Sequence, residues 1–287
     1  MGSLAKAVGK WRSTLSLKSF ESESASLFKG LQANKVPGSL SLALDGTLKE
    51  GHDMKVFGLG TLAGMQSRER YQQFLTNMHA VHGAMEEELD ATCDDPSVST
   101  DVIRCVWQNH GKRLRRKDRL EQDLQELQHL LTDDSPNETM SEVAAQVSPK
   151  TIDYVQRIRQ SGSIDRENGS GLLLGHLYCR YFADLLGGQM LGRPFQLALQ
   201  LPVLPRHLIF TLEKENRKEY LEELYGDLNT AGNMLTPAQL DDVRKESILA
   251  FQHNARVYSE DPKMRSQAVQ GGMNFMLGGV ASLISVR

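Results

Sequence analysis

Apolar side chains recur every three or four residues through almost the whole chain, which is the spacing of one face of an α-helix. Over residues 67–89 the repeat is carried by Tyr71, Phe74, Leu75, Met78, Val81, Met85 and Leu89. Ser67 precedes this stripe as a candidate N-cap, and a run that contains Pro96 ends it. Runs of Val, Ile and Thr, which favour strands, are scarce. The pattern therefore predicts an all-α fold.

Further helical stripes follow along the chain. One begins near Asp101 and includes leucines at 120, 124, 127 and 131, and another covers 152–158 and is closed by Ser161-Gly162-Ser163. Two more cover 172–191 and 220–228, and the last begins at Thr236-Pro237, a cap followed by proline at the first helical position. We expect a multi-helical, up-and-down domain over residues 39–262, with tails at 1–38 and 263–287.

Charge and cysteine content narrow the class of protein. The net charge is −3, without the basic excess that nucleic-acid binding requires. Cys93, Cys105 and Cys179 are scattered, and no two have the spacing of a zinc or redox motif. The sequence therefore predicts an intracellular protein with free thiols in a reducing compartment.

The two ends of the chain differ in composition. The first twenty residues carry four basic side chains and no acidic one, which is typical of a plastid or mitochondrial transit segment or of a disordered tail. Residues 271–286 are uncharged, but a spanning helix needs about 20 apolar residues. We expect a docked tail or a shallow membrane contact there.

A cluster of positive charge lies near the middle of the sequence. It consists of Lys112, Arg113, Arg115, Arg116, Lys117 and Arg119. Two interpretations stay open, a docking patch for an acidic partner and a solvated helix face.

Residues 175–192 read GHLYCRYFADLLGGQMLG, a helical pattern with paired glycines in its interior. Each of Gly187 and Gly188 costs roughly 1 kcal/mol relative to alanine in a helix. Paired glycines permit a bend and a close approach of a flat ligand, or else a tight helix crossing. Asp184 precedes them by one turn, so its side chain can point at whatever the bend exposes.

This stretch resembles the distal-helix signature of the heme oxygenases. Three further blocks agree in order and spacing: Met85-Glu-Glu-Glu-Leu, Arg116-Lys117 followed by Leu-Glu-Gln-Asp-Leu from Leu120, and Phe251 with Asn254 and Tyr258. The resemblance covers about residues 40–260. It implies a heme oxygenase-like helical bundle with a kinked distal helix.

The resemblance also implies roles for particular residues. Asp184 would be catalytic, ordering water for oxygen activation. Gly187 and Gly188 would let the backbone lie close to heme, and Tyr178 would lie near a propionate. Phe251 and Asn254 would belong to the same cofactor pocket.

The family's axial histidine is harder to place. A small insertion makes His52 the iron ligand. Counting back from Tyr71 without gaps puts Lys49 at that position instead, and matching Leu48-Lys-Glu-Gly to the family's similar entry sequence puts Val56 there. His79 and His82, on the next helix, are less favoured alternatives.

Two further positions depart from the family pattern. Ala183 replaces the small glycine before the aspartate. On the helix where the family uses basic residues toward the propionates, this chain has Glu222 and Gly226. We expect Glu222 and Asp227 to repel the propionates unless Arg217 or Lys218 reaches across.

Two functions follow from the resemblance. The first is an enzyme that cleaves heme to biliverdin, carbon monoxide and ferrous iron. It would use O2 and electrons from a ferredoxin or a flavin reductase, docked on the basic cluster from Lys112 to Arg119. The alternative is a catalytically degenerate binding or assembly protein in an organelle.

Overall fold

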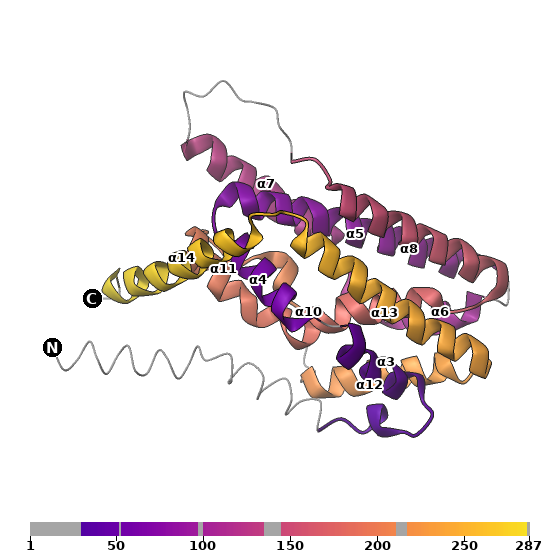
Figure 1. Cartoon of the computed structure of the whole chain (residues 1–287). Coiled ribbons are helices and arrows are strands. Elements are labelled where there is room, and N and C mark those ends of the chain that lie inside the picture. Colours follow the sequence, from indigo (N-terminus) through magenta and orange to yellow (C-terminus); the bar gives the residue numbers. More distant parts are fainter. Residues whose placement is uncertain (1–29, 52, 97–99, 135–144, 211–216, 286–287) are drawn as a thin grey trace.

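The computed structural model describes residues 30–51, 53–96, 100–134, 145–210 and 217–285 (Figure 1). Within these ranges all regular structure is helical and no strand occurs, which confirms the predicted all-α class. Transit-type residues 1–29 and the candidate ligand His52 lie outside the described residues.

The helices follow one another with mostly short connections. In chain order the α-helices are α3 (Leu40–Gly51), α4 (Met54–Gly64), α5 (Arg68–Asp94), α6 (Asp101–Leu114), α7 (Lys117–Asp134), α8 (Pro149–Asn168), α9 (Leu172–Leu177), α10 (Ala183–Leu186), α11 (Gly192–Leu199), α12 (Arg217–Gly232), α13 (Pro237–Ser259) and α14 (Met264–Ser285). Short 3-10 turns are η1 (Ala33–Lys35), η4 (Gly188–Leu191) and η5 (Arg206–Leu208), and η3 (Tyr178–Phe182) is π-helical.

Helix starts are capped where the sequence predicts it. The Ser67 hydroxyl accepts a hydrogen bond from the Arg70 amide at 3.2 Å. At the start of α13, Thr236 and Gln239 form a reciprocal capping box, and proline occupies the first turn. These caps satisfy backbone amides that have no partner within the helix, so the sequence fixes where these helices begin.

The predicted helix end at Ser161-Gly162-Ser163 is wrong, because α8 continues to Asn168. A Cβ on Gly162 would lie 2.2 Å from the Glu88 carboxylate of α5. Gly162 therefore serves close helix packing rather than termination. The helix ends at Gly169, which adopts a left-handed conformation with φ of 66°.

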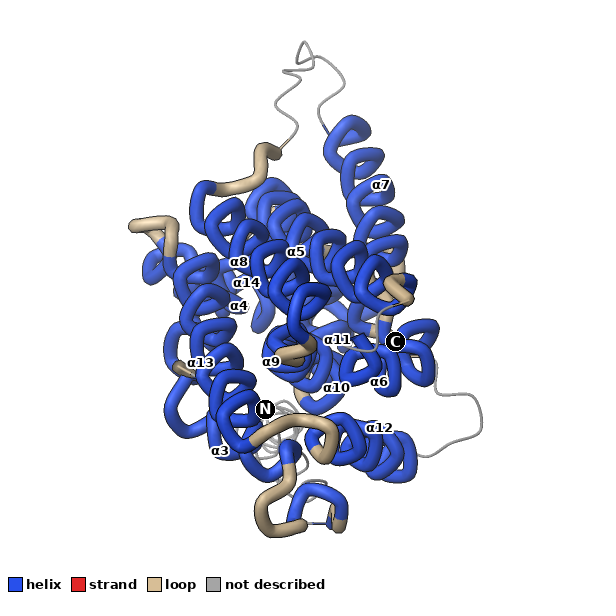
Figure 2. Tube along the Cα trace, turned by 90° about the vertical axis from the view of Figure 1, so that its right-hand side faces the viewer, coloured by secondary structure: helices blue, strands red, loops and turns tan. Residues whose placement is uncertain are grey.

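The central segment, α9 with η3 and α10, runs through the interior of the bundle (Figure 2). Every residue from 171 to 182 is buried. Helix α13 packs against α9 and α3, while α5 packs against α7 and α8, and α12 contacts α6 and α3. This arrangement surrounds the glycine-containing motif with helices from both halves of the chain.

The C-terminal segment forms a docked helix. Helix α14 packs on α4 and α11, and Gly271 and Gly278 on this face abut the backbone carbonyls of Leu62 and Leu197. The opposite face exposes Val269, Met273, Met276, Leu277 and Val280. Among the described helices, none is long and apolar enough to cross a membrane.

Candidate functional site

The central segment is interrupted at the position that the paired glycines indicate. After the π-helical turn Tyr178–Phe182, α10 ends at Leu186. Gly187 has φ of −124° and ψ of −37°, outside the helical region, and a 3-10 turn follows. The axis therefore changes between α10 and α11. A π-helical turn next to such a break is common at functional sites.

The glycine pair leaves room beside the backbone. A Cβ on Gly187 would meet only the Ala183 carbonyl oxygen, at 3.4 Å, among the described atoms. A Cβ on Gly188 would contact Asp184 and Leu208 at ordinary van der Waals distances. Neither glycine is required by a tight helix crossing. The open side at Gly187 suits the approach of a flat ligand to the backbone.

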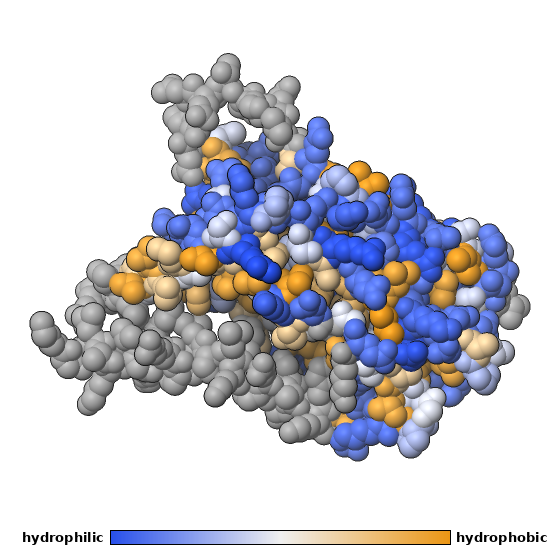
Figure 3. Space-filling view, in the orientation of Figure 1, coloured by the Kyte–Doolittle hydropathy of each residue, from blue (hydrophilic) through white to orange (hydrophobic). Residues whose placement is uncertain are grey.

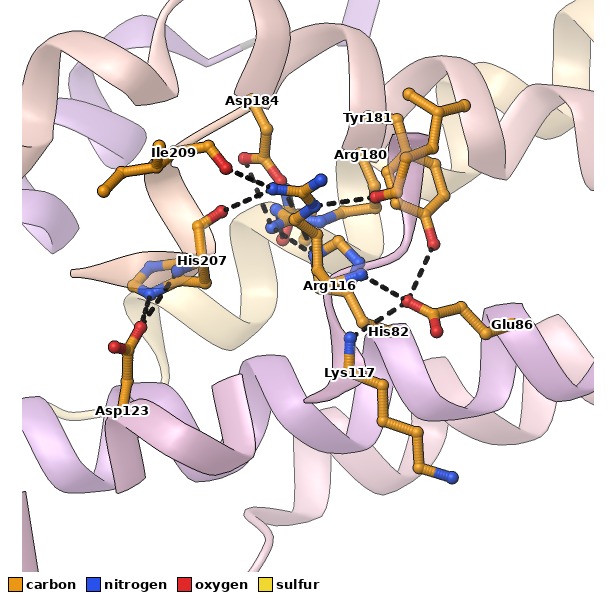
Figure 4. A network of polar contacts seen from close by, with 12 residues as sticks. His82, Glu86, Arg116, Lys117, Asp123, Arg180, Tyr181, Asp184, His207 and Ile209 are labelled. Atoms are coloured by element: carbon orange, nitrogen blue, oxygen red, sulfur yellow. Dashed lines mark hydrogen bonds and ion pairs between the residues drawn. The ribbon is translucent and has the colours of Figure 1, made fainter. Parts of the chain in front are cut away.

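Asp184 faces a buried polar cluster on α5 and the central segment (Figure 4). Its Oδ2 lies 3.6 Å from His82 Nε2, and its Oδ1 lies 3.8 Å from Arg180 Nη2. The Asp184 side chain is 15% exposed, whereas those of His82 and Arg180 are 2% and 6% exposed. The carboxylate is thus held at the edge of the interior and does not project into bulk solvent.

His82 is neutral near pH 7. Burial lowers the pKa of its imidazole well below the ordinary value, and the charges of Arg180 and Arg116 lower it further. Arg180 Nη2 lies 3.3 Å from His82 Nε2, so the guanidinium donates and Nε2 accepts. His82 Nδ1 and Arg180 Nε are buried without a hydrogen-bond partner among the described residues.

Arg180 supplies the positive charge that faces Asp184. Burial opposes its ionisation, but the Asp184 carboxylate contributes to a net rise in the pKa of this guanidinium. Arg180 also donates to the Asn254 amide oxygen at 3.2 Å, which links the predicted Asn254 on α13 to the distal cluster. The charged pair leaves Asp184 able to accept further hydrogen bonds.

Arg116 and Glu86 brace the same region (Figure 4). Arg116 is 1% exposed, and its guanidinium donates to the carbonyls of Leu114, Ile209 and Arg113. The Glu86 carboxylate accepts from the Arg116 and Lys117 amides at 2.6 and 3.0 Å and so caps α7. The two sequence blocks that contain these residues therefore fix the start of α7 beside the central segment.

The other predicted cofactor residues lie toward α3. Phe251 is buried against Gly51 at the end of α3, with its Cβ 2.9 Å from the position of a Cβ on Gly51. The ring of Tyr178 lies 6.5 Å from that of Phe251. Tyr178 donates its hydroxyl proton to Asp45 of α3 at 2.6 Å. The predicted residues thus divide into a polar group around Asp184 and an aromatic group beside α3.

The two acids expected at the propionate side, Glu222 and Asp227, have partners of their own in the structure. Glu222 accepts hydrogen bonds from the backbone amides of Gln32 and Ala33 at 2.5 and 2.9 Å, so it caps η1. Asp227 lies 2.9 Å from His110 Nε2, on α6. Both carboxylates thus contact residues of neighbouring helices. The acid that accepts a hydrogen bond from Tyr178 is Asp45.

The two basic candidates of α12 contact other parts of the described chain. Arg217 donates to the carbonyl of Leu185 in the central segment. The Lys218 side chain lies beside Gly30, with Cε 3.4 Å from the position of a Cβ there. Arg217 therefore ties α12 to α10 directly before the glycine pair.

Two features of the site were not predicted from the sequence. His82 was considered only as a metal ligand, although its place on the buried stripe of α5 indicates an interior position. Asp45 has a weaker signal, a lone acid among the apolar residues of 40–48. Its partners Tyr178 and Tyr225 are 133 and 180 residues away, so only the fold identifies them.

The residues present fit a flat, iron-bearing porphyrin on the distal side. A Cβ on Gly187 would meet only the Ala183 carbonyl oxygen among the described atoms, and Asp184 lies three residues earlier as a hydrogen-bond acceptor. In the part of the chain described here, no cluster of three metal-ligating side chains forms. The candidate iron ligand His52 lies outside the described residues and stays a prediction.

Comparison with known proteins gives one consistent result. The heme oxygenase family model matches residues 48–260. The chain is 28% identical over 201 residues to a heme oxygenase of Takifugu rubripes, covering 70% of this chain and 65% of that protein. It is 29% identical over 233 residues to human heme oxygenase 1, covering 80% of this chain and 74% of that protein.

A solved structure agrees in fold. The crystal structure of heme oxygenase-1 from the cyanobacterium Synechocystis, in complex with heme, superimposes with a TM-score of 0.59 at 23% identity. The match covers 87% of this chain and all of that one. At this identity the likeness concerns the arrangement of the helices.

Proposed function

The chain belongs to the heme oxygenase family, and we propose that it binds heme and cleaves it oxidatively to biliverdin, carbon monoxide and ferrous iron. The observation that carries the proposal is the position of Asp184. It lies one turn before the glycine break and is paired with Arg180 beside His82. The chemistry requires O2 and reducing equivalents, which we assign to a ferredoxin or a flavin reductase as electron donor.

In this proposal the chain's own residues position water and protons and hold the ligand. Asp184 Oδ1 and Oδ2 accept hydrogen bonds from water at the ligand face and relay a proton there. Arg180 lies beside the carboxylate and orients it, and Arg180 is itself held by a hydrogen bond to Asn254. Gly187 and Gly188 admit the porphyrin plane to the backbone. His52 remains our proposed axial ligand.

Hemin titration followed by reduction tests this function. Purified protein should develop the Soret band of an axially ligated heme, and a reductant with O2 should then produce biliverdin absorbance. Asp184→Asn should retain hemin binding but lose turnover by about 100-fold, because a positioned acid–base group contributes roughly 10²–10⁴ in rate. His52→Ala should abolish the histidine-ligated spectrum if His52 is the ligand.

The matched control is Asp153→Asn, which removes an exposed carboxylate on α8 that pairs with Lys150. It should change neither binding nor rate. A protein that binds hemin yet yields no biliverdin with any reductant would instead be a catalytically degenerate member. A protein without any Soret shift would contradict heme binding.

We propose the cluster from Lys112 to Arg119 as the electron donor's docking site. Three of its members pair within the chain: Arg113 with Glu223, Arg115 with Asp90 and Lys117 with Glu87. Such surface pairs are worth about 0–1 kcal/mol each, so an acidic partner can exchange for them. Charge reversal at Arg115 should raise the KM for ferredoxin, with an effect that weakens as salt increases.

We also propose that the exposed face of α14 makes a shallow membrane contact. The spacing of five exposed apolar side chains puts them on one side of the helix: Val269, Met273, Met276, Leu277 and Val280. Figure 3 shows hydrophobic surface in the region of α14. The helix contains no acidic residue, and Arg265 stands in its first turn. Co-sedimentation with anionic vesicles should fall when Met273 and Leu277 are both replaced by glutamate.

A further inference from the structure

Asp45 lies near the middle of α3, and three neutral donors hold its carboxylate. The hydroxyls of Tyr178 and Tyr225 donate to Oδ1 at 2.6 and 2.7 Å. The side-chain amide of Asn34 donates to Oδ2 at 2.8 Å. These donors come from the central segment, α12 and η1, so the fold gathers them around a single anion. We call these four residues the Asp45 cluster.

The Asp45 cluster is an internal anion site. Tyr178 and Tyr225 are 1% and 0% exposed, and a buried hydroxyl bonds more strongly to an ionised acceptor than to a neutral one. Burial raises the pKa of Asp45, while its three hydrogen bonds oppose that rise. Because all three donors are neutral, they orient the carboxylate without cancelling its charge.

This arrangement conflicts with the binding of a second carboxylate at Tyr178. A tyrosine hydroxyl carries one proton, so it cannot donate to Asp45 and to a porphyrin propionate at once. A propionate beside Tyr178 would also face the Asp45 charge. Asp45, which contacts Tyr178 directly, is therefore a source of repulsion at this side of the site.

We infer that Asp45 determines porphyrin specificity, discriminating against an anionic carboxylate at the Tyr178 edge by holding both tyrosine hydroxyls and presenting like charge. The inference rests on the proposed heme site and deepens it. It assigns the site a preference for a porphyrin edge that is uncharged or whose carboxylate lies away from Tyr178. Asp45 is a specificity-determining residue and has no role in the reaction itself.

The test compares hemin with its dimethyl ester, in which methylation of both propionates removes their negative charge. Hemin and hemin dimethyl ester, in the same detergent, are titrated into the full chain and into Asp45→Asn. The ratio compared between the two proteins is the Kd for hemin divided by the Kd for the ester. The ratio should fall about tenfold in Asp45→Asn, the size expected for removing one nearby like charge at an effective dielectric near 20 after partial screening. Affinity for the ester alone should change less than threefold.

Asp227→Asn is the charge-matched control, since it removes a carboxylate that pairs with His110 away from Tyr178. Its Kd ratio should equal that of the unchanged chain. Asp45→Ala, which removes the acceptor of both hydroxyls, should lower the ratio at least as far as Asp45→Asn. Circular dichroism of each apo variant shows whether the helices are retained.

The outcomes separate this inference from the proposed function. If the unchanged chain and Asp45→Asn bind hemin and its ester with the same ratio, Asp45 does not set specificity, although heme binding stands. If no variant binds either porphyrin, the heme site itself is excluded and the inference with it. Should Asp45→Asn fail to fold, a Kd for hemin equal to that for the ester in the unchanged chain would overturn the inference.

Discussion

The Nε2 atom of His82 on α5 lies 3.6 Å from Oδ2 of Asp184 on α10, and the Arg180 guanidinium contacts both side chains. Because His82 is neutral, it acts on Asp184 through Arg180: it accepts one hydrogen bond and fixes the orientation of the guanidinium. The geometry of the proposed catalytic carboxylate therefore depends on a side chain 102 residues earlier in the sequence.

Removing the acceptor at position 82 should impair turnover without preventing heme binding. We expect His82→Leu to lower the rate of biliverdin formation about tenfold. A hydrogen bond to a charged group is worth roughly 1.5–3 kcal/mol, and only part of that free energy serves to orient the Arg180 guanidinium toward Asp184. His82→Gln, which can still accept from Arg180, should restore most of the rate. Equal rates in the two variants would show that the acceptor is unimportant.

The buried His82 should also make folding stability depend on pH. Its pKa is lowered in the folded state, so below the unfolded value near 6.5 the unfolded chain binds the extra proton. The contribution of His82 to the free energy of unfolding is therefore present above pH 6.5 and is lost as the pH falls below that value. At pH 5.5 the loss should be about 1.4 kcal/mol relative to pH 7.5.

Urea denaturation of the full chain and of His82→Gln at both pH values measures this contribution. The variant should lose about 1.4 kcal/mol less between pH 7.5 and 5.5. His110, whose pKa burial also lowers, remains in both proteins and cancels in the comparison. An identical pH response in the two proteins would mean that folding does not lower the pKa of His82.

A second buried carboxylate holds the other side of the central segment. Glu246 of α13 accepts from Arg157 Nε at 2.8 Å and lies 2.8 Å from His176 Nε2, and both partners lower its pKa to about 2 despite burial. Glu246→Gln should cost about 3 kcal/mol in urea unfolding at pH 7, because it leaves a partly buried arginine unpaired. Glu223→Gln, which breaks the exposed pair with Arg113, should cost less than 1 kcal/mol.

The acid dependence of the Glu246 effect has a definite sign. A lowered folded pKa gives stability that is complete above the unfolded value near 4.5 and disappears as pH falls toward 2. The difference between the full chain and Glu246→Gln should therefore shrink between pH 5 and pH 3. A difference that stays constant would assign the effect to packing.

Local sequence signals gave most of the fold. The apolar stripe before Leu89, the caps at Ser67 and Thr236 and the glycine pair each act within a few residues, so their consequences could be predicted. The helix end predicted at Gly162 was wrong because that glycine allows close packing against the side chain of Glu88, a residue 74 positions earlier in the sequence. The same limit applies to Asp45 and Glu222, whose partners are set by tertiary packing.

The glycines of α14 provide a final prediction, because the adjacent residues Gly271 and Gly272 have different surroundings. A Cβ on Gly271 would lie 1.8 Å from the Leu62 carbonyl oxygen of α4, whereas a Cβ on Gly272 would meet no described atom within 4 Å. Gly271→Ala should therefore displace α14 from α4, because the added methyl group would clash with the backbone of Leu62, which cannot move aside as a flexible side chain can. Gly272→Ala should instead stabilise the helix by about 0.5–1 kcal/mol.

Limited trypsin digestion measures the displacement, because Lys263 and Arg265 stand at the start of α14. Gly271→Ala should be cleaved there at least tenfold faster than Gly272→Ala, which should resist as well as the unchanged chain. Binding of a hydrophobic dye should rise in Gly271→Ala as the packed face is exposed. If both alanine variants resist trypsin equally, α14 does not depend on close contact with α4, and its docking must come from the α11 side through Gly278.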